Sequence, residues 1–167
     1  VLSRKNLPSY YLRDFIGNAK IEYVQHHQSH AAAGYFTSPY EESAIVVIDA
    51  IGEFETCSIW YAWGSHFEKR YTLKYPNSLG LWYSAMTQRL GLKPQEDEYI
   101  TMGMAAYGHR TYNLEELLWQ NNQWGVGNLL PNAKNEDLAL SIQILYERKF
   151  LELVRMCTKK NLILMGG

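Results

Sequence analysis

The sequence has few cysteines, almost no net charge and no long apolar run. The two cysteines, Cys57 and Cys157, form no spaced motif, which is typical of the reducing cytosol. Lys+Arg 16 against Asp+Glu 17 leaves a net charge of -1, so the charge balance does not favour a nucleic-acid or acidic-membrane partner. No apolar stretch approaches membrane-spanning length, and no basic-then-apolar leader precedes the rest. We therefore expect a cytoplasmic protein that binds neither nucleic acid nor membrane.

The composition is typical of a globular domain. The chain has 167 residues, of which 47% are apolar and 20% charged, enough to bury the core of one domain. It begins at Val1 without an initiating methionine. It ends with the strand-like run 162–165 and the pair Gly166-Gly167, a pattern that commonly leads into a phosphate-approaching loop and a helix. We therefore expect a fragment of a longer protein.

Three of the five histidines lie within residues 26–30. If a helix begins here, His26 and His30 stand at i and i+4 on one face, close enough to share a metal ion, while His27 points elsewhere. Imidazole is the commonest metal ligand in proteins. The general-base glutamate of zinc peptidases is missing from this spacing, which disfavours a peptidase. The alternative is that these histidines only cap a helix and contact solvent.

Asp49 is the candidate for a third ligand. It closes the apolar run Ala44-Ile45-Val46-Val47-Ile48, and the C-terminal end of a buried strand is a usual place for a site in an α/β sheet. Two imidazoles and a carboxylate suit iron or zinc better than magnesium or calcium. The sequence therefore predicts a site for Fe²⁺, or another divalent ion such as Zn²⁺, at His26, His30 and Asp49.

Hydrophobic periodicity and turn residues predict an α/β chain. Helices are predicted at 8–16, 29–36, 79–90, 113–120 and 135–160, and strands at 21–24, 44–49, 56–62, 67–75 and 162–165. Strands 44–75 should form an antiparallel meander, with the continuous apolar first strand at its buried centre. Residues 93–108 are predicted to be irregular. This order of elements is expected of a ribonuclease-H-like unit.

Several motifs resemble those of the NodU/CmcH-type carbamoyltransferases, in the same order along nearly the whole chain. HHQSHAA at 26–32 resembles their HHxSHAA, DAIGE at 49–53 their DGxGE, and SLGLWYSA at 78–85 their SLGLLYSA. Residues 98–108 are similar to their E-x-x-x-MGLAxYG segment, 137–143 to their DiAxxxQ helix, and 164–167 to the start of their GGxxxN loop. HHxSH alone is a weak signal, whereas several motifs in register are a specific one.

The resemblance implies part of an N-terminal domain with an ASKHA (actin/hexokinase/Hsp70-like) fold. Residues 1–42 would end the first ribonuclease-H-like half, and residues 43–167 would form most of the second, truncated at its C-terminus. Enzymes of this family make carbamoyl-adenylate from carbamoyl phosphate and ATP in a separate YrdC-like domain. They then transfer the carbamoyl group to a hydroxyl of a small-molecule acceptor. His26, His30 and Asp49 match the family's metal ligands, with a further aspartate expected beyond Gly167.

The resemblance also implies which residues bind the nucleotide. Gly52 with Glu53, and Gly166 with Gly167, would lie near the phosphate, whereas Glu98 and Gly103 would lie near the nucleoside. Two residues depart from the family pattern: Ala50 replaces the first glycine of DGxGE, and Ala106 replaces the proline of APYG. The first departure adds a Cβ where backbone approaches the ligand, so it bears on phosphate binding and leaves the metal ligands intact.

Two alternative functions remain at this stage. One is a related protein of tRNA threonylcarbamoylation or hydrogenase maturation, and the other is a non-catalytic nucleotide-binding module. The segments 78–85 and 102–108 favour the relatives that transfer a carbamoyl group to a hydroxyl. Because a metal ligand and the activating domain are expected elsewhere, we expect no carbamoyl transfer by the isolated chain. Uncovered apolar surface and strand edges would favour its self-association.

Overall fold

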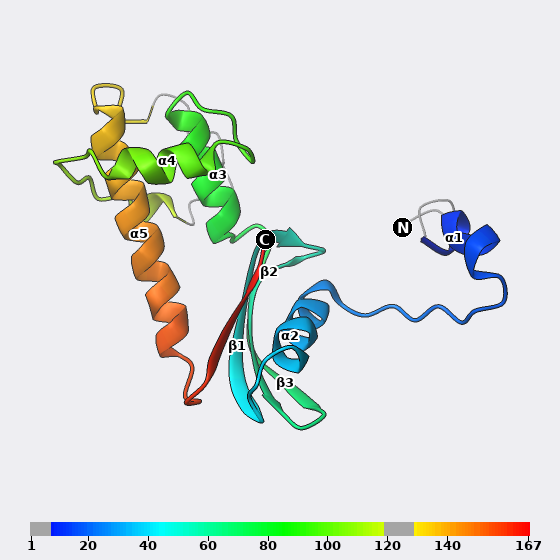
Figure 1. Cartoon of the computed structure of the whole chain (residues 1–167). Helices are drawn as coiled ribbons and strands as arrows, with labels where there is room; N and C mark the ends of the chain where they lie inside the picture. The colour runs from blue at the N-terminus through cyan, green and yellow to red at the C-terminus, as the bar shows by residue number, and fades with distance from the viewer. Residues whose placement is uncertain (1–7, 119–128) are drawn as a thin grey trace.

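The computed structural model describes residues 8–118 and 129–167, which form a mixed sheet flanked by helices (Figure 1). The sheet order is β3-β2-β1-β4, in which β1 is antiparallel to β2 and parallel to β4. In chain order the elements are α1 (Pro8–Ile16), α2 (His26–Phe36), β1 (Glu42–Gly52), β2 (Glu55–Trp63), β3 (His66–Lys74), α3 (Leu79–Arg89), α4 (Glu98–Ala105), the 3-10 helix η2 (Glu115–Leu117), α5 (Asn135–Arg155) and β4 (Leu162–Gly166).

Strand β1 occupies the interior of the sheet because both of its faces are apolar. Ala44, Ile45, Val46 and Val47 are each at most 1% exposed. Pairing with β4 is parallel, with Val46 opposite Leu164, so the C-terminal ends of both strands meet at one edge of the sheet. The edge where parallel strands end is the usual location of a site in an α/β sheet. Here it carries Asp49.

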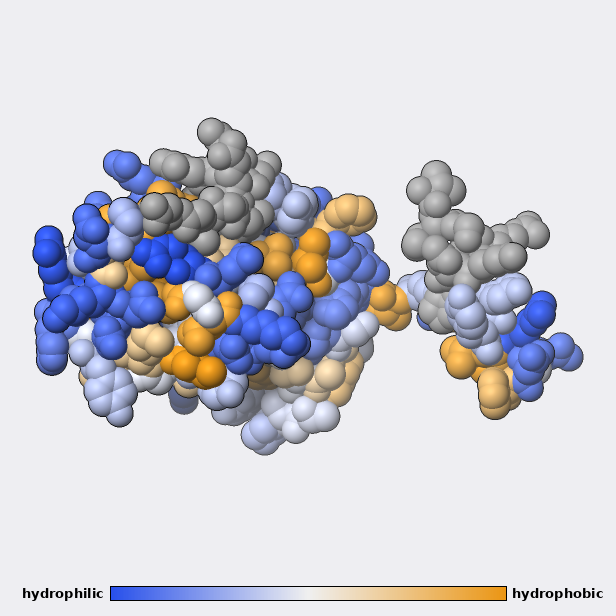
Figure 2. Space-filling view, turned by 90° about the horizontal axis from the view of Figure 1, so that it is seen from above, coloured by the Kyte–Doolittle hydropathy of each residue, from blue (hydrophilic) through white to orange (hydrophobic). Residues whose placement is uncertain are grey.

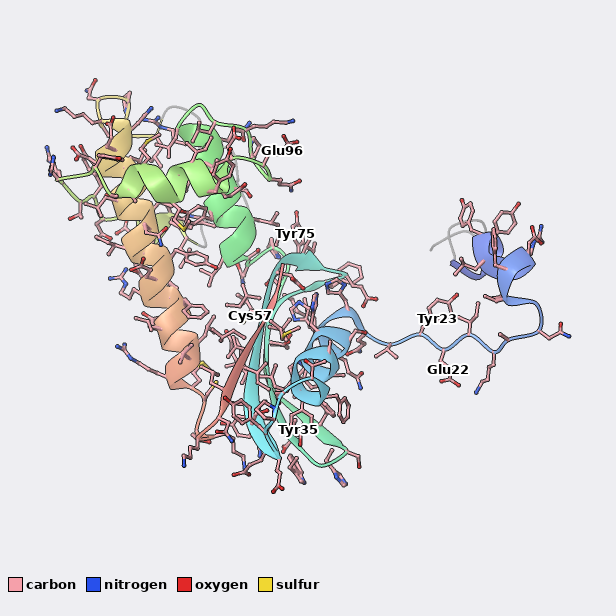
Figure 3. All side chains as sticks on the ribbon, viewed as in Figure 1. Glu22, Tyr23, Tyr35, Cys57, Tyr75 and Glu96 are labelled. Carbon is pink, nitrogen blue, oxygen red and sulfur yellow. The ribbon has the colours of Figure 1, made fainter. Side chains whose placement is uncertain are left out.

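Helix α2 covers one face of the sheet (Figure 1). Its buried residues His27, Ala31, Gly34 and Tyr35 recur at helical spacing and face the strands. Ala31 and Tyr35 form one core cluster with the inward side chains of β1, β2 and β4. Tyr35 lies at the end of α2 next to the sheet, with its ring 5.5 Å from that of Phe67 (Figure 3). This packing holds α2 against one face of the sheet.

Helices α3, α4 and α5 form a second layer on the side of the sheet opposite α2 (Figure 1). Their buried residues form the largest core cluster, which includes Trp82, Met86, Leu138 and Ile142. Ser78 begins α3 as its N-cap, because its Oγ accepts a hydrogen bond from the Leu81 backbone N–H at 3.1 Å. The layer contacts β1 through α3, which places the helices beside the strand end that carries the site.

The predicted α/β class, a mixed sheet flanked by helices, is confirmed, and so is the antiparallel meander of β1, β2 and β3. The prediction of irregular structure at 93–108 is wrong, because helix α4 forms there and buries Thr101 and Ala105, four residues apart. The helix predicted at 113–120 is reduced to η2, and its residues 119 and 120 lie outside the described ranges. The boundary after residue 42 stays a prediction.

The strand predicted at residues 21–24 is also not formed. Helix α1 lies away from the sheet, and the chain between α1 and α2 carries Glu22 and Tyr23 along an extended linker (Figures 2 and 3). Within the described residues this linker pairs with no strand. The alternating apolar and polar residues at 21–24 therefore lie in an exposed segment, where Tyr23 and Val24 are both more than half exposed. None of the helices in the described ranges is both long and apolar enough to cross a membrane.

Candidate metal centre and adjoining pocket

The first turn of α2 brings two of the candidate ligands together. The helix begins at His26, three residues earlier than the sequence indicates, so His26 and His30 stand one turn apart on the same helix. Their Nε2 atoms lie 3.1 Å from each other. His26 is 45% exposed and His30 28% exposed at the side chain, so this face is open to solvent and to an incoming ion.

Asp49 meets these histidines from the end of β1. Its Oδ2 lies 2.9 Å from His26 Nε2 and 3.5 Å from His30 Nε2. One ligand atom from each of the three residues lies within 4.8 Å of the others, which is close enough for one ion to contact all three. The side chain of Asp49 is only 6% exposed. The structure thus brings the three predicted metal residues together, although they come from two elements.

The other carboxylate oxygen of Asp49 is held by the end of β4. Asp49 Oδ1 accepts a hydrogen bond from the Gly167 backbone N–H at 2.9 Å. Gly166 permits this approach, because its φ of 134° is unfavourable for other residues and an added Cβ would collide with the carbonyl of Ile48. The glycine pair therefore orients the carboxylate, a contact that the resemblance alone does not indicate.

The residues present fit a divalent metal ion. Asp49 Oδ2 is buried and accepts no hydrogen bond within the described residues, which is unusual for a carboxylate oxygen. Facing it are imidazole nitrogens, so a bound cation would supply the missing partner. Two imidazoles and one carboxylate suit Fe²⁺ or Zn²⁺.

His27 was predicted to point away from this site, and that prediction is wrong. Its side chain is fully buried, and its Nε2 lies 3.3 Å from Asp49 Oδ2. Successive helical residues are turned by about 100°, so His27 faces the sheet below its two neighbours. Burial lowers the pKa of His27 and keeps the ring neutral. The signal was present in the sequence, because His27 shares its face with Ala31 and Tyr35.

Gly52 lies against the imidazole rings of His26 and His27, where only glycine leaves room for them. A Cβ at this position would collide with the ring of His26 and would lie 2.8 Å from Cδ2 of His27. We expect Gly52→Ala to weaken Co²⁺ binding about tenfold, since the rings must shift away from Asp49. Titration of the chain with Co²⁺, followed by visible absorbance, measures the affinity.

Gly64→Ala serves as the matched control for this substitution. Gly64 lies in the next hairpin at φ 57°, with nothing within 4 Å of an added Cβ. Alanine there should cost roughly 1–2 kcal/mol of stability through backbone strain and leave Co²⁺ affinity unchanged. Equal Co²⁺ affinity of Gly52→Ala and the unsubstituted chain would contradict the role assigned to Gly52.

A pocket of about 710 Å³ adjoins the metal residues. Asp49 and Gly167 form its border with the cluster, and helices α3, α4 and α5 form the other walls. The lining residues are Ile48, Asp49, Ala50, Gly80, Tyr83, Ser84, Gln95, Glu98, Tyr99, Met102, Gln143, Tyr146 and Gly167. Ala50 contributes to the wall, so its extra Cβ stands beside the space that a ligand would enter.

The six predicted nucleotide-binding residues do not all meet in this pocket. Glu98 and Gly167 line it, and Gly166 lines a smaller neighbouring hollow. Gly52 and Glu53 lie where β1 turns into β2, and Gly52 lies beside the histidine rings. Gly103 stands on α4 with open space around it. The lining residues Tyr83 and Tyr146 were predicted only as core-facing helix positions, and Gln143 was noted only as the end of the motif at 137–143.

Polar groups on the pocket wall are held in a fixed arrangement. Tyr83 donates its hydroxyl hydrogen to Gln143 Oε1 at 2.8 Å, and burial raises the pKa of Tyr83 to about 12, so it is neutral at physiological pH. Glu98 Oε1 accepts hydrogen bonds from the Gln95 backbone N–H at 2.6 Å and from the hydroxyl of Ser84. The pocket therefore combines aromatic and thioether surface with an oriented carboxylate, a pattern suited to a small polar ligand.

Comparison with known proteins shows which proteins this chain is similar to. The family described as carbamoyltransferase N-terminus matches residues 12–125. The chain is 36% identical over 90 residues to a nodulation protein, NolNO, of Sinorhizobium fredii, an alignment that covers 54% of this chain and 13% of that protein. It is 33% identical over 85 residues to the nodulation protein NolO of Bradyrhizobium diazoefficiens, covering 51% and 15%.

A further relative is an uncharacterized protein of Synechocystis, 43% identical over 88 residues, which are 53% of this chain and 14% of that protein. The chain thus spans less than a fifth of the length of each of these relatives. The family match covers more than half of the chain and includes His26, His30, Asp49 and Glu98. On this evidence the chain belongs to the carbamoyltransferase N-terminus family.

Proposed function

We propose that this chain provides the transfer site of an O-carbamoyltransferase. The carbamoyl group would pass from carbamoyl-adenylate, made from carbamoyl phosphate and ATP, to a hydroxyl of a small-molecule acceptor. The observation that carries the proposal is the position of Asp49, whose buried Oδ2 faces two imidazoles at the border of the pocket. Family membership supports the reaction class.

His26, His30 and Asp49 would hold the metal ion, Fe²⁺ or another divalent ion such as Zn²⁺. When bound, such an ion supplies Lewis-acid chemistry that polarises an oxygen of the carbamoyl donor. The chain's own contribution is orientation: Gly167 fixes one carboxylate oxygen of Asp49, and the pocket holds the donor next to it. Fixed geometry of this kind lowers the entropic cost of bringing two reactants together.

The pocket fits the adenylate part of the donor. Tyr99, Tyr146 and Met102 offer apolar surface for a base, and Glu98 offers a carboxylate for ribose hydroxyls. Since Ser84 and Gln95 already hold Oε1 of Glu98, Oε2 is the oxygen that would accept from the ligand. Carboxylate acceptors form the stronger class of hydrogen bond, worth roughly 1.5–3 kcal/mol.

We therefore expect Glu98→Gln to weaken binding of AMP to this chain by about tenfold or more, measured by isothermal titration calorimetry. Glu96→Gln is the matched control, since Glu96 lies two residues away, pairs with Lys93 at the surface and is 60% exposed (Figure 3). Its affinity for AMP should equal that of the unsubstituted chain. Equal losses in both variants would show that charge near α4, and not a contact from Glu98, sets the affinity.

The proposed reaction is tested in the protein that carries this chain. Supplied with radiolabelled carbamoyl phosphate, ATP, Fe²⁺ and a panel of hydroxyl compounds, it should form an alkali-labile O-carbamoyl product. Omission of ATP or addition of a chelator should remove that product. Labelled product that forms equally well without ATP, or in the presence of the chelator, would contradict the proposal.

A further inference from the structure

A series of buried polar side chains leads from β2 through His27 to Asp49. It begins at Trp60, whose indole N–H can only donate, and does so to Ser58 Oγ at 2.8 Å. Ser58 Oγ also lies 2.8 Å from Nδ1 of His27. No other hydrogen bond of the Ser58 hydroxyl occurs among the described residues, so its own hydrogen is directed to His27.

This arrangement fixes where His27 carries its hydrogen. A neutral imidazole has one N–H, and its other nitrogen accepts. Since Nδ1 accepts from Ser58, the N–H is at Nε2, which lies 3.3 Å from Asp49 Oδ2. Both of these atoms are buried, and neither makes a hydrogen bond within the described residues. The N–H at Nε2 and the carboxylate oxygen are thus an unsatisfied donor and an unsatisfied acceptor, 3.3 Å apart.

Glu55, which lies near Nδ1 of His27, does not favour the tautomer with hydrogen at Nδ1. Glu55 Oε2 lies 3.9 Å from His27 Nδ1, beyond hydrogen-bond distance. Its Oε1 is paired with Lys69 Nζ at 2.6 Å, which balances the charge of the carboxylate. Ser58 Oγ, at 2.8 Å, is thus nearer to Nδ1 than Glu55 Oε2, at 3.9 Å.

We propose that His27 is a positioning residue, and that the series Trp60, Ser58, His27 holds the Asp49 carboxylate in place for metal binding. His27 approaches Asp49 from the fully buried side, whereas His26 and His30 approach from the open side. An Nε2 that carries hydrogen has no lone pair for an ion, so His27 is placed to donate to the carboxylate and not to bind the metal. The metal part of this inference rests on the proposed function above.

The tautomer is measured without any metal. In long-range ¹H–¹⁵N spectra of the metal-free, ¹⁵N-labelled chain, His27 should show an unprotonated Nδ1 and a protonated Nε2. Ser58→Ala removes the donor to Nδ1 and should abolish this preference. Ser43→Ala is the matched control, because Ser43 is another fully buried strand serine, and its Oγ has no hydrogen-bond partner within the described residues. It should leave the His27 signals unchanged.

Co²⁺ titrations test the positioning role. His27→Ala should weaken Co²⁺ binding by about 10- to 100-fold, the usual effect of losing a partner of a metal ligand. His27→Gln, which keeps an N–H near the position of Nε2, should recover most of that loss. The visible Co²⁺ spectrum should be the same in His27→Gln and in the unsubstituted chain, because the number of imidazole ligands does not change.

The possible failures are distinguishable. If the unsubstituted chain binds no Co²⁺, the proposed metal site and its function are overturned, whatever the state of His27. If Co²⁺ binds but His27 is protonated at Nδ1 in the metal-free chain, the hydrogen-bond series is overturned. A change of the Co²⁺ spectrum in His27→Gln would show that His27 is itself a ligand, which contradicts the positioning role.

Discussion

Substitution of Asp49 by Asn is expected to lower the Co²⁺ affinity of the chain at least about 100-fold, equivalent to about 2.8 kcal/mol. Asp49 is the only anionic member of the cluster with His26 and His30, and its Oδ2 is the atom that both imidazoles face. An amide oxygen carries no charge and is a poorer ligand for Fe²⁺ or Zn²⁺. Isothermal titration calorimetry with Co²⁺, and with Zn²⁺ in parallel, measures the loss.

The fold of the Asp49→Asn variant should survive. Asn keeps an Oδ1 that can accept from the Gly167 N–H, and it removes a buried charge whose Oδ2 has no hydrogen-bond partner within the described residues. Without metal, the variant should therefore remain folded, although its Nδ2 would face the N–H of His27, two donors together, and lower the unfolding temperature. Asp14→Asn, on the exposed helix α1, is the control and should leave both measurements unchanged. Retention of Co²⁺ affinity within about threefold would exclude Asp49 as a ligand.

The part of the structure that could be predicted depends on regular spacing along the chain. The apolar run from Ala44 to Ile48 requires burial on both faces, so an interior strand was predictable. The i and i+4 spacing of His26 and His30 requires only that a helix begin near residue 26. Asp49 followed from its place at the end of that strand. Each of these inferences uses local geometry that tertiary structure did not override.

The features that were missed depend on contacts between distant segments. Helical spacing could have placed His27 on the buried face of α2, but its approach to Asp49 and Ser58 arises because α2 packs across β1 and β2. Tyr83 on α3 and Gln143 on α5, which are 60 residues apart in the sequence, meet in the pocket. Helix α4 is short, and it is stabilised by packing against α5 more than by its own sequence. Alternating residues near Tyr23 resemble a strand, but the strand is not formed because the segment pairs with no strand in the described structure.

A second large effect is expected in the helical layer. Ile142 is fully buried in the core cluster that joins α5 to α3, between Leu138 and Leu145 on the same helix face. Ile142→Ala should lower the free energy of unfolding by about 2–5 kcal/mol, because it removes buried apolar surface and leaves a cavity. For a chain of this length, each kcal/mol corresponds to roughly 2–4 °C in Tm. Chemical denaturation followed by circular dichroism measures the change.

Ile144 provides the matched control on the same helix. It is 46% exposed, so Ile144→Ala should change the stability by no more than about 0.5 kcal/mol. The two isoleucines flank Gln143, whose Oε1 accepts from Tyr83 at the pocket wall, so a cavity at Ile142 should also weaken AMP binding. Co²⁺ affinity should persist, because α2 and its core cluster lie on the other face of the sheet. Equal destabilisation by both alanines would mean that α5 does not pack through the Ile142 face.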